Sequence, residues 1–254
     1  MNTLITEFKG EISDKTLPRY DIVSLEFPTD YDGTTVVDIK RKESGSAIIG
    51  SDESTEVNVL NASGTVIGTT PYNVPYNASY TRTFKMASGT KFYIEGLKDL
   101  IYFSIGNVAG TGIVQLKEDS KDLNVLFNKS DLYVLNVRRQ DSIKCNIETL
   151  VGNKTGFKEI FISDNTNSNI YGNIICLSNN IELTKFVMYS SNISGNVENL
   201  ADAMVANGRT GGILYINVES TSCIGVPGFG LKADIHFTND TTTYPRGWYT
   251  TVHS

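Results

Sequence analysis

Two related stretches of sequence decide the fold, Ile170-Tyr-Gly-Asn-Ile-Ile-Cys-Leu177 and Ile193-Ser-Gly-Asn-Val-Glu-Asn-Leu200. A third version, Ile143-Lys-Cys-Asn-Ile-Glu-Thr-Leu150, precedes them in the chain. All three fit Ile-x-[Cys/Gly]-Asn-[Ile/Val]-x-x-Leu, a match too long to arise by coincidence. The pattern therefore predicts one structural unit that the chain uses repeatedly.

A second pattern, apolar-x-x-apolar-x-apolar, occurs four times in the same half of the chain. Its central residues are 25, 26 and 30 positions apart (135 to 160, 160 to 186, 186 to 216), which is close to the spacing of leucine-rich repeats. We expect a solenoid in which each unit has a short strand, a turn held by the asparagine, and a returning segment whose leucine closes the core. The four copies are Leu132, Leu135 and Val137; Phe157, Ile160 and Ile162; Leu183, Phe186 and Met188; and Ile213, Ile216 and Val218.

The asparagine of each unit is expected to hydrogen-bond the backbone where the chain leaves the strand. In the third unit the return is predicted to be helical over residues 197–206, with Asn207-Gly208 as its C-terminal stop. The residues expected to share one face of this helix are Val197, Leu200, Ala201 and Met204.

The first half of the chain is a succession of short segments rich in β-branched and aromatic residues, separated by turn residues. This spacing predicts an antiparallel β-sandwich or a related fold. Residues 56–60 and 65–68 are expected to form a hairpin. Further strands are predicted at residues 81–86 and 123–127.

The expected fold class is therefore mainly β. A β-sandwich-like domain over residues 17–129 is followed, over residues 130–254, by a short leucine-rich-repeat-like solenoid with little helix. Strands at residues 231–237 and 248–252 are predicted to form a β cap over the open end of the solenoid. Residues 1–16 are expected to be an N-terminal arm or anchor, with a first strand as the alternative.

Composition excludes several kinds of partner. The formal net charge is −6 and the pI is near 5.0. The longest basic runs, Lys40-Arg41-Lys42 and Arg138-Arg139, are too short for a phosphate-tracking face, so we expect no nucleic-acid partner. No stretch approaches 18 consecutive apolar residues, so no membrane insertion is expected.

The supply of residues for catalysis or metal binding is poor. The two histidines are His236, in an alternating strand pattern, and the penultimate His253. Cys145, Cys176 and Cys223 are an odd number without metal-ligand spacing, so we expect free, mostly buried thiols. We therefore expect no enzyme activity, no metal and no cofactor. A glycoside hydrolase, which needs only two carboxylates, stays open as an alternative.

A tyrosine-rich surface is the candidate for binding. Tyr72, Tyr76 and Tyr80 lie in a proline-containing segment and suit contacts with glycans or proteins, unless the rings pack under their own loop. The second candidate surface is the outward face of the solenoid strands, which is where repeat proteins usually bind, unless those residues face the neighbouring domain. The residues expected on that face are Tyr133, Asn136, Phe161, Lys185, Tyr215 and Asn217.

The repeats also carry a resemblance to a known kind of protein. Residues 169–177 and 192–200 resemble divergent leucine-rich-like repeats of Bacteroidetes and their phages, and residues 236–252 resemble the ends of such domains. Joined to a β-rich first half with no export signal, the chain resembles a head or tail fibre-like virion appendage protein of crAss-like Bacteroides phages.

The resemblance implies a non-enzymatic structural protein that is assembled in the host cytoplasm and exposed on the virion. Its N-terminal part would attach to the particle, and its repeat domain would point outward, with host-surface polysaccharide as a further contact. Its implied partners are other copies of itself, as a dimer or trimer, and other virion proteins. The alternative is a glycan-binding or adhesion module of a bacterial cell surface.

Overall fold

A computed structural model describes residues 22–26, 35–51, 58–60, 65–76, 91–107, 115–116, 120–127, 130–164, 168–189, 191–218, 220, 222–224 and 232–252. The structure is mainly β, with large sheets that are not closed. The predicted arm at residues 1–16 and the predicted strand at 81–86 lie outside the described residues.

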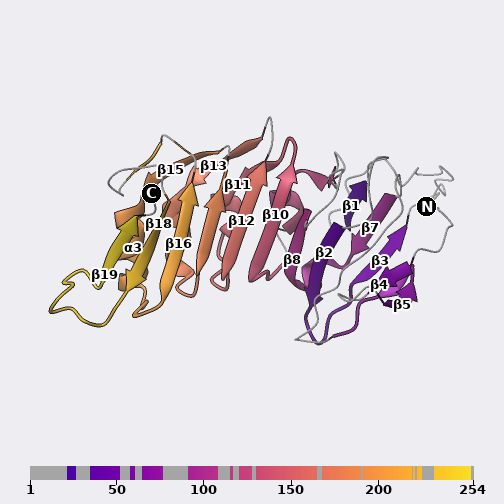
Figure 1. Cartoon of the computed structure of the whole chain (residues 1–254), viewed down its shortest axis with the longest axis horizontal. Coiled ribbons are helices and arrows are strands. Elements are labelled where there is room, and N and C mark those ends of the chain that lie inside the picture. The colour runs from indigo at the N-terminus through magenta and orange to yellow at the C-terminus, as the bar shows by residue number, and fades with distance from the viewer. Residues whose placement is uncertain are drawn as a thin grey trace, which may run out of the picture.

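One sheet of eight strands runs along most of the molecule (Figure 1). Its strands, from one edge to the other, are β19 (Trp248–Val252), β18 (Lys232–Phe237), β16 (Ile213–Val218), β14 (Lys185–Met188), β12 (Glu159–Asp164), β10 (Val134–Gln140), β8 (Leu100–Asn107) and β2 (Thr35–Arg41). The five strands from β8 to β16 are parallel to one another. At the two ends the pairing is antiparallel, between β2 and β8 and among β16, β18 and β19.

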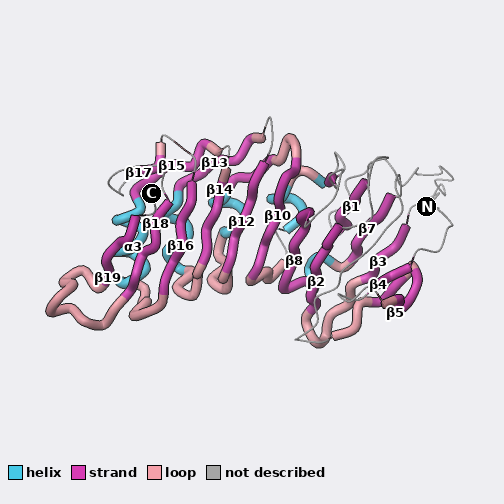
Figure 2. Tube along the Cα trace, in the orientation of Figure 1, coloured by secondary structure: helices cyan, strands magenta, loops and turns pink. Residues whose placement is uncertain are grey.

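A second, parallel sheet and a row of short helices return the chain from each strand to the next. The sheet contains β11 (Lys144–Asn146), β13 (Asn169–Asn173), β15 (Asn192–Asn196) and β17 (Cys223–Ile224). The helical segments are α1 (Leu123–Phe127), α2 (Ile147–Val151), η3 (Ile174–Asn179) and α3 (Val197–Ala206). Figure 2 shows these segments, in cyan, behind the eight-stranded sheet. Three successive units of strand, short strand and helical segment therefore start at β10, β12 and β14.

The helix predicted at residues 197–206 is confirmed, since α3 has these bounds and ends at a cap on Asn207. Its buried residues are Val197, Leu200, Ala201 and Met204, as expected from the pattern. The strand predicted at residues 123–127 is wrong, because this segment is α1. Asp122 accepts hydrogen bonds from the backbone of Asn124 and Val125 at 3.1 and 3.3 Å, which favours a helical turn.

The apolar repeats form the core between the sheet and its returns. The residues of the first three copies are at most 1% exposed, but Ile213 of the fourth copy is 47% exposed. In the first three units the leading apolar residue precedes the strand. In the fourth, β16 already begins at Ile213 because it pairs with β18, so alternation turns Ile213 outward and Leu214 inward.

A fifth copy of the pattern occurs earlier in the chain, at Leu100, Phe103 and Ile105, which are fully buried. These residues lie on β8, which pairs in parallel with β10. The eight-stranded sheet thus runs across the boundary predicted at residue 129. The division into domains stays a prediction.

The remaining described strands form antiparallel pairs at the β2 end of the molecule. A five-stranded sheet contains β6 (Tyr72–Asn73), β3 (Ile48–Ser51), β7 (Lys91–Glu95), β1 (Ile22–Glu26) and β9 (Gln115–Leu116). The short helix η1 (Leu97–Asp99) joins β7 to β8. The hairpin predicted around residues 56–68 is confirmed by the antiparallel pair β4 (Asn58–Leu60) and β5 (Val66–Thr69).

The repeated asparagines cap the helical segments, which confirms their expected role. The side-chain oxygens of Asn146, Asn173 and Asn196 accept hydrogen bonds from the backbone N–H two residues further on, at 2.9, 3.0 and 2.7 Å. These N–H groups have no partner within a helix, so the caps satisfy them where each strand turns into its return.

The glycine before two of these asparagines is required by close packing between units. Gly195 has φ +113°, and an added Cβ would lie 2.5 Å from the Oδ1 of Asn173 in the preceding unit. Gly172, with φ +127°, would meet the side chain of Ile147 at 2.7 Å in the same way. Only glycine combines this backbone conformation with such a close approach.

The C-terminal strand pair is tied to α3 by two carboxylates of that helix, Asp202 and Glu198. Asp202 accepts hydrogen bonds from Nε of Arg246 at 3.0 Å and from Nε1 of Trp248 at 2.7 Å. Arg246 also forms an ion pair with Glu198 at 2.9 Å. The hydrogen bond from Arg246 holds the pKa of Asp202 below its usual value.

Replacing the cap of α3 should lower stability measurably. We expect Asn196→Ala to reduce the free energy of unfolding by about 1 kcal/mol, because two backbone N–H groups lose their acceptor. Asn196→Ser should retain most of this stability. Urea denaturation followed by circular dichroism measures the effect, with the exposed α3 residue Asn199 changed to Ala as the control. An Asn196→Ala variant as stable as the control would contradict the capping role.

The Asp202 contacts should make stability depend on pH. Folding lowers the pKa of Asp202, so its ionised form stabilises the folded protein. This stabilisation is fully present above the pKa of the unfolded chain, at about pH 4, and is lost as the pH falls through the pKa of the folded protein. We expect Asp202→Asn to destabilise the chain at pH 7 by at most about 1 kcal/mol, since the side chain is 46% exposed. The difference in free energy of unfolding between the variant and the wild type, measured by urea denaturation at pH 7 and pH 2.5, should be smaller at pH 2.5. An equal difference at both values would refute the assignment.

Candidate functional site

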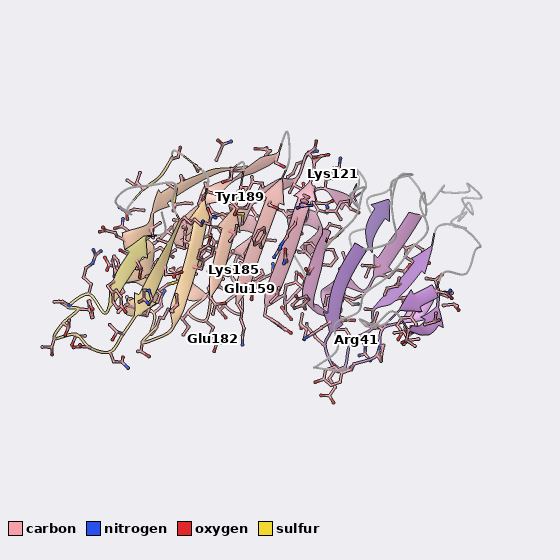
Figure 3. The ribbon with its side chains drawn as sticks, in the orientation of Figure 1. Arg41, Lys121, Glu159, Glu182, Lys185 and Tyr189 are labelled. Carbon is pink, nitrogen blue, oxygen red and sulfur yellow. The ribbon has the colours of Figure 1, made fainter. Side chains whose placement is uncertain are left out.

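The outward side of the parallel strands forms a continuous surface, which we call the open face. It consists of the outward side chains of β8, β10, β12, β14 and β16, together with Tyr133 just before β10 and Tyr189 just after β14. Strand pairing arranges most of them in two rows. One row is Tyr102, Val134, Glu159, Lys185 and Tyr215, and the next is Ser104, Asn136, Phe161, Val187 and Asn217. Figure 3 shows Glu159, Lys185 and Tyr189 over the middle of the sheet.

The structure brings six of the predicted site residues together on the open face. Asn136, Phe161 and Lys185 alternate outward with core residues, as do Tyr215 and Asn217 on β16. Tyr133 contacts this face through its ring, which lies edge-on to Tyr102 with 6.2 Å between the ring centroids. Partial burial raises the pKa of Tyr133 above its usual value.

The other three predicted residues are not on this face. Tyr72 belongs to β6, at the edge of the five-stranded sheet, where it is half-buried and packs against the core. Tyr76 is exposed nearby in the chain, and Tyr80 lies outside the described residues. Tyr72 therefore packs against the core, and its role in binding stays a prediction.

Side chains on the open face form a connected network around β12 and β14. Phe161 lies edge-on to Tyr189, with 6.0 Å between the ring centroids. Nδ2 of Asn217 donates to the hydroxyl of Tyr189 at 2.9 Å and to that of Tyr215 at 3.3 Å. These contacts leave Asn217 only 6% exposed, although it points outward. The network holds its rings and amides in place, which lowers the entropy cost of binding a ligand.

Sequence reasoning missed Tyr102, Glu159, Arg138 and Tyr189 on this face. Alternation along the strands would have identified Glu159 and Arg138, which are spaced by two residues from Phe161 and Asn136. Tyr102 could be placed on this face only after the fifth copy of the apolar pattern, around Phe103, was recognised. Tyr189 follows the end of β14 and continues the alternation of Lys185 and Val187, so the same spacing would have identified it if the outward row had been extended past the strand.

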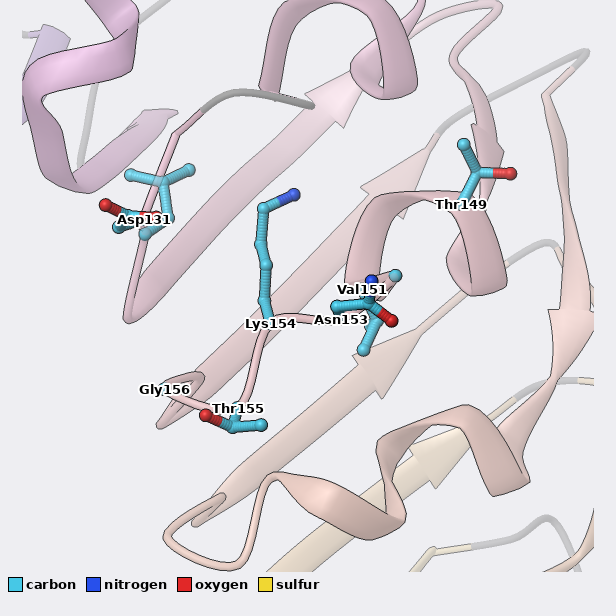
Figure 4. A pocket seen from close by; sticks show the side chains of 9 residues that line it. Asp131, Thr149, Val151, Asn153, Lys154, Thr155 and Gly156 are labelled. Carbon is cyan, nitrogen blue, oxygen red and sulfur yellow. The ribbon is translucent and has the colours of Figure 1, made fainter.

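A cavity of about 610 Å³ opens beside α2 rather than on the open face (Figure 4). It is lined by Asp131, Lys154 and the loop before β12. Nζ of Lys154 donates to the carbonyl of Leu150 at 2.8 Å, and Asp131 pairs with Lys42 at 2.5 Å. Burial lowers the pKa of Lys154, while Asp131 opposes that shift. Both charged groups thus already have partners.

The histidine among the described residues contacts its neighbours on the C-terminal strand pair. His236 lies on β18, stacks on Tyr249 at 4.7 Å between ring centroids, and has its Nε2 2.7 Å from the hydroxyl of Thr251. The described residues contain no group of three or more His, Cys, Asp or Glu side chains that could hold a metal ion. Among the helices that are described, none is long and apolar enough to cross a bilayer.

The three cysteines are free, and two of them, Cys145 and Cys223, are buried, which confirms the prediction for those two. Cys176 is half-buried. Burial raises the pKa of Cys223 to about 11 and that of Cys176 to about 12, and it also raises the pKa of Cys145. The three thiols therefore stay protonated at neutral pH, a state in which they are poor nucleophiles.

Comparisons with protein-family models, with curated proteins and with solved structures found no match for this chain.

Proposed function

We propose that this chain is a non-enzymatic structural protein of a phage virion, a head or tail fibre-like component that presents the open face to a host surface. In this proposal the units from β8 to β16 are a short leucine-rich-repeat-like solenoid, and β18 and β19 cap its end. The antiparallel sheets at the other end are the sandwich-like part, which attaches to the particle with residues 1–16 as an arm.

The solenoid interpretation is supported by the way each unit repeats the same contacts. Each of the three central units has one strand in the large parallel sheet, one in the small parallel sheet, and an asparagine-capped helical segment. In such an arrangement each unit contacts its neighbours only, so the core continues from unit to unit. The antiparallel β18 and β19 stop the parallel series, as a terminal cap must.

The open face is the observation that carries a binding role. Its rings and amides come from five adjacent strands, and neighbouring strands lie about 4.8 Å apart, so the surface is extended rather than a single deep pocket. Aromatic rings with few rotatable bonds, surrounded by amide groups, suit contact with glycans or proteins. Weak contacts of this kind gain strength when several copies act together, which fits a dimeric or trimeric appendage.

The first test concerns the particle. We expect antibodies against this chain to label purified particles of the phage that encodes it, and a chain lacking residues 1–16 to be lost from them. Immunogold electron microscopy and quantitative mass spectrometry measure both effects, with a known coat protein as the reference. Particles without the chain would refute the virion assignment, and normal incorporation of the shortened chain would refute the arm.

The second test concerns the open face. We expect Phe161→Ser to reduce binding of the purified, labelled chain to host cells about tenfold or more, because the ring lies at the centre of the side-chain network. Tyr171→Ser is the matched control, since Tyr171 is 43% exposed but lies on the small parallel sheet. Flow cytometry over a concentration series measures binding, and urea denaturation checks that both variants fold. Equal binding by both variants would contradict a role for the open face.

A further inference from the structure

Two cationic side chains on the open face approach the same aromatic ring. Cζ of Arg138 lies 4.3 Å from the centroid of the Phe161 ring, and Nζ of Lys185 lies 5.2 Å from it. Asn136 pairs with Phe161, so Arg138 is two residues further along β10. Phe161 in turn pairs with Val187, so Lys185 is two residues back along β14. The ring therefore lies diagonally between the two cations.

Neither cation forms an ion pair with a carboxylate of the described residues, although Glu159 lies opposite Lys185 in the sheet. Among the described residues, ion pairs join Lys42 to Asp131, Lys158 to Glu182, and Arg246 to Glu198 and Asp202. Nε of Arg138 instead donates to the side-chain oxygen of Asn136 at 2.9 Å, which leaves its full positive charge in place. Two like charges held near one ring repel each other, and a bound anion would relieve that repulsion.

Arg138 is also held in position by the buried structure beneath it. The pairing of β10 with β12 shifts between Val137 and Gln140, and Arg139 has a positive φ of 56°. Gln140, which is 1% exposed, donates from Nε2 to the carbonyl oxygen of Arg138 at 3.0 Å and accepts from the backbone N–H of Leu116 at 2.7 Å. A β-bulge of this kind redirects a side chain, and strained residues of this kind cluster at ligand sites.

We propose that Arg138, Lys185 and Phe161 form an anion-binding subsite of the open face, and that its ligand is an acidic polysaccharide. This inference rests on the proposed function and names the ligand of the same surface. The guanidinium and the ammonium group, diagonally placed around the ring, each bind a carboxylate or sulfate, and a sugar unit spans the ring between them. The edge of Phe161 and the hydroxyl of Tyr189 contact the rest of that sugar unit.

The surroundings of the subsite favour a polysaccharide over an acidic polypeptide. Asn136 and Tyr189 offer amide and hydroxyl groups that match sugar hydroxyls, and the Tyr102–Tyr133 pair provides further ring area on the next strands. A chain of sugars lying across the strands meets new outward side chains at each strand. The described edges of the sheet are β2 and β19, so the subsite, at its middle, has no free strand edge on which a peptide could pair.

Binding of defined polymers to the full chain tests the proposal. The probes are polygalacturonate, which carries carboxylates, dextran sulfate, neutral dextran and poly-L-glutamate, each measured by biolayer interferometry. We expect binding to polygalacturonate, to dextran sulfate or to both, weakened by added salt. Arg138→Gln and Lys185→Gln should each weaken it about tenfold, since each removes one charge-assisted contact. Lys144→Gln is the control, because this exposed lysine lies on β11 in the small parallel sheet.

Each outcome decides the question. Binding to polygalacturonate, to dextran sulfate or to both supports the subsite if it is about tenfold weaker in both variants but not in the control. The preferred polymer identifies the anionic group. The proposal is overturned if the chain binds only dextran, binds poly-L-glutamate equally well, or binds neither acidic polysaccharide. It is also overturned if the two variants bind the acidic polysaccharides as the wild type does. Urea denaturation confirms that each variant is folded, and Arg138→Lys, which keeps the charge, should retain part of the affinity.

The cell-binding assay separates this inference from the proposed function. If cell binding falls in Phe161→Ser but not in Arg138→Gln or Lys185→Gln, the open face binds a ligand of another kind, so the inference fails and the proposed function stands. If particles lack the chain while acidic polysaccharide still binds through both cations, the virion assignment fails and the subsite stands.

Discussion

The arrangement of this chain depends on the hydrogen bonds by which Asn146, Asn173 and Asn196 hold the start of each return segment. A parallel sheet needs a crossover connection after every strand, and each crossover exposes backbone N–H groups where strand turns into helix. An asparagine side chain accepts a hydrogen bond from one of these N–H groups in each of three successive units. The adjacent glycines let each unit approach the asparagine or the isoleucine of the unit before it. Capping and close packing therefore act at the same point of each unit.

Because of this constraint, the two sides of the parallel strands differ. The side of the parallel strands that faces the returns is filled by apolar residues that are almost completely buried. The other side carries no returning segment in the described structure, so rings, amides and charges lie on it in register. The bulge at Arg138 and Arg139 interrupts this regularity at one place. Its buried support by Gln140 makes the interruption a fixed feature of the open face.

Much of the repeat half could be predicted from the sequence. The apolar spacing identified the core of the first three units, and the asparagine pattern identified the caps. The heptad-like spacing of Val197, Leu200, Ala201 and Met204 identified the buried face of α3.

The errors have local causes. Ile213 faces outward because pairing with β18 starts β16 earlier, and residues 123–127 form α1 because Asp122 caps a turn where strand-like residues follow. The fifth apolar copy was missed because its spacing to the next unit, from 103 to 135, is longer than the others.

The sequence by itself determined that the chain is mainly β and which residues enter the core of the repeats. It also determined which strand residues point outward, namely Asn136, Phe161, Lys185, Tyr215 and Asn217. These properties depend on alternation and on short-range spacing. Only the tertiary structure decided that Arg138 and Lys185 converge on Phe161, that Tyr189 bonds Asn217, and that β8 belongs to the same sheet as β16. These contacts join residues more than 20 positions apart. They depend on the register between strands and on the bulge, which are set by packing of the whole core and not by any local stretch of the chain.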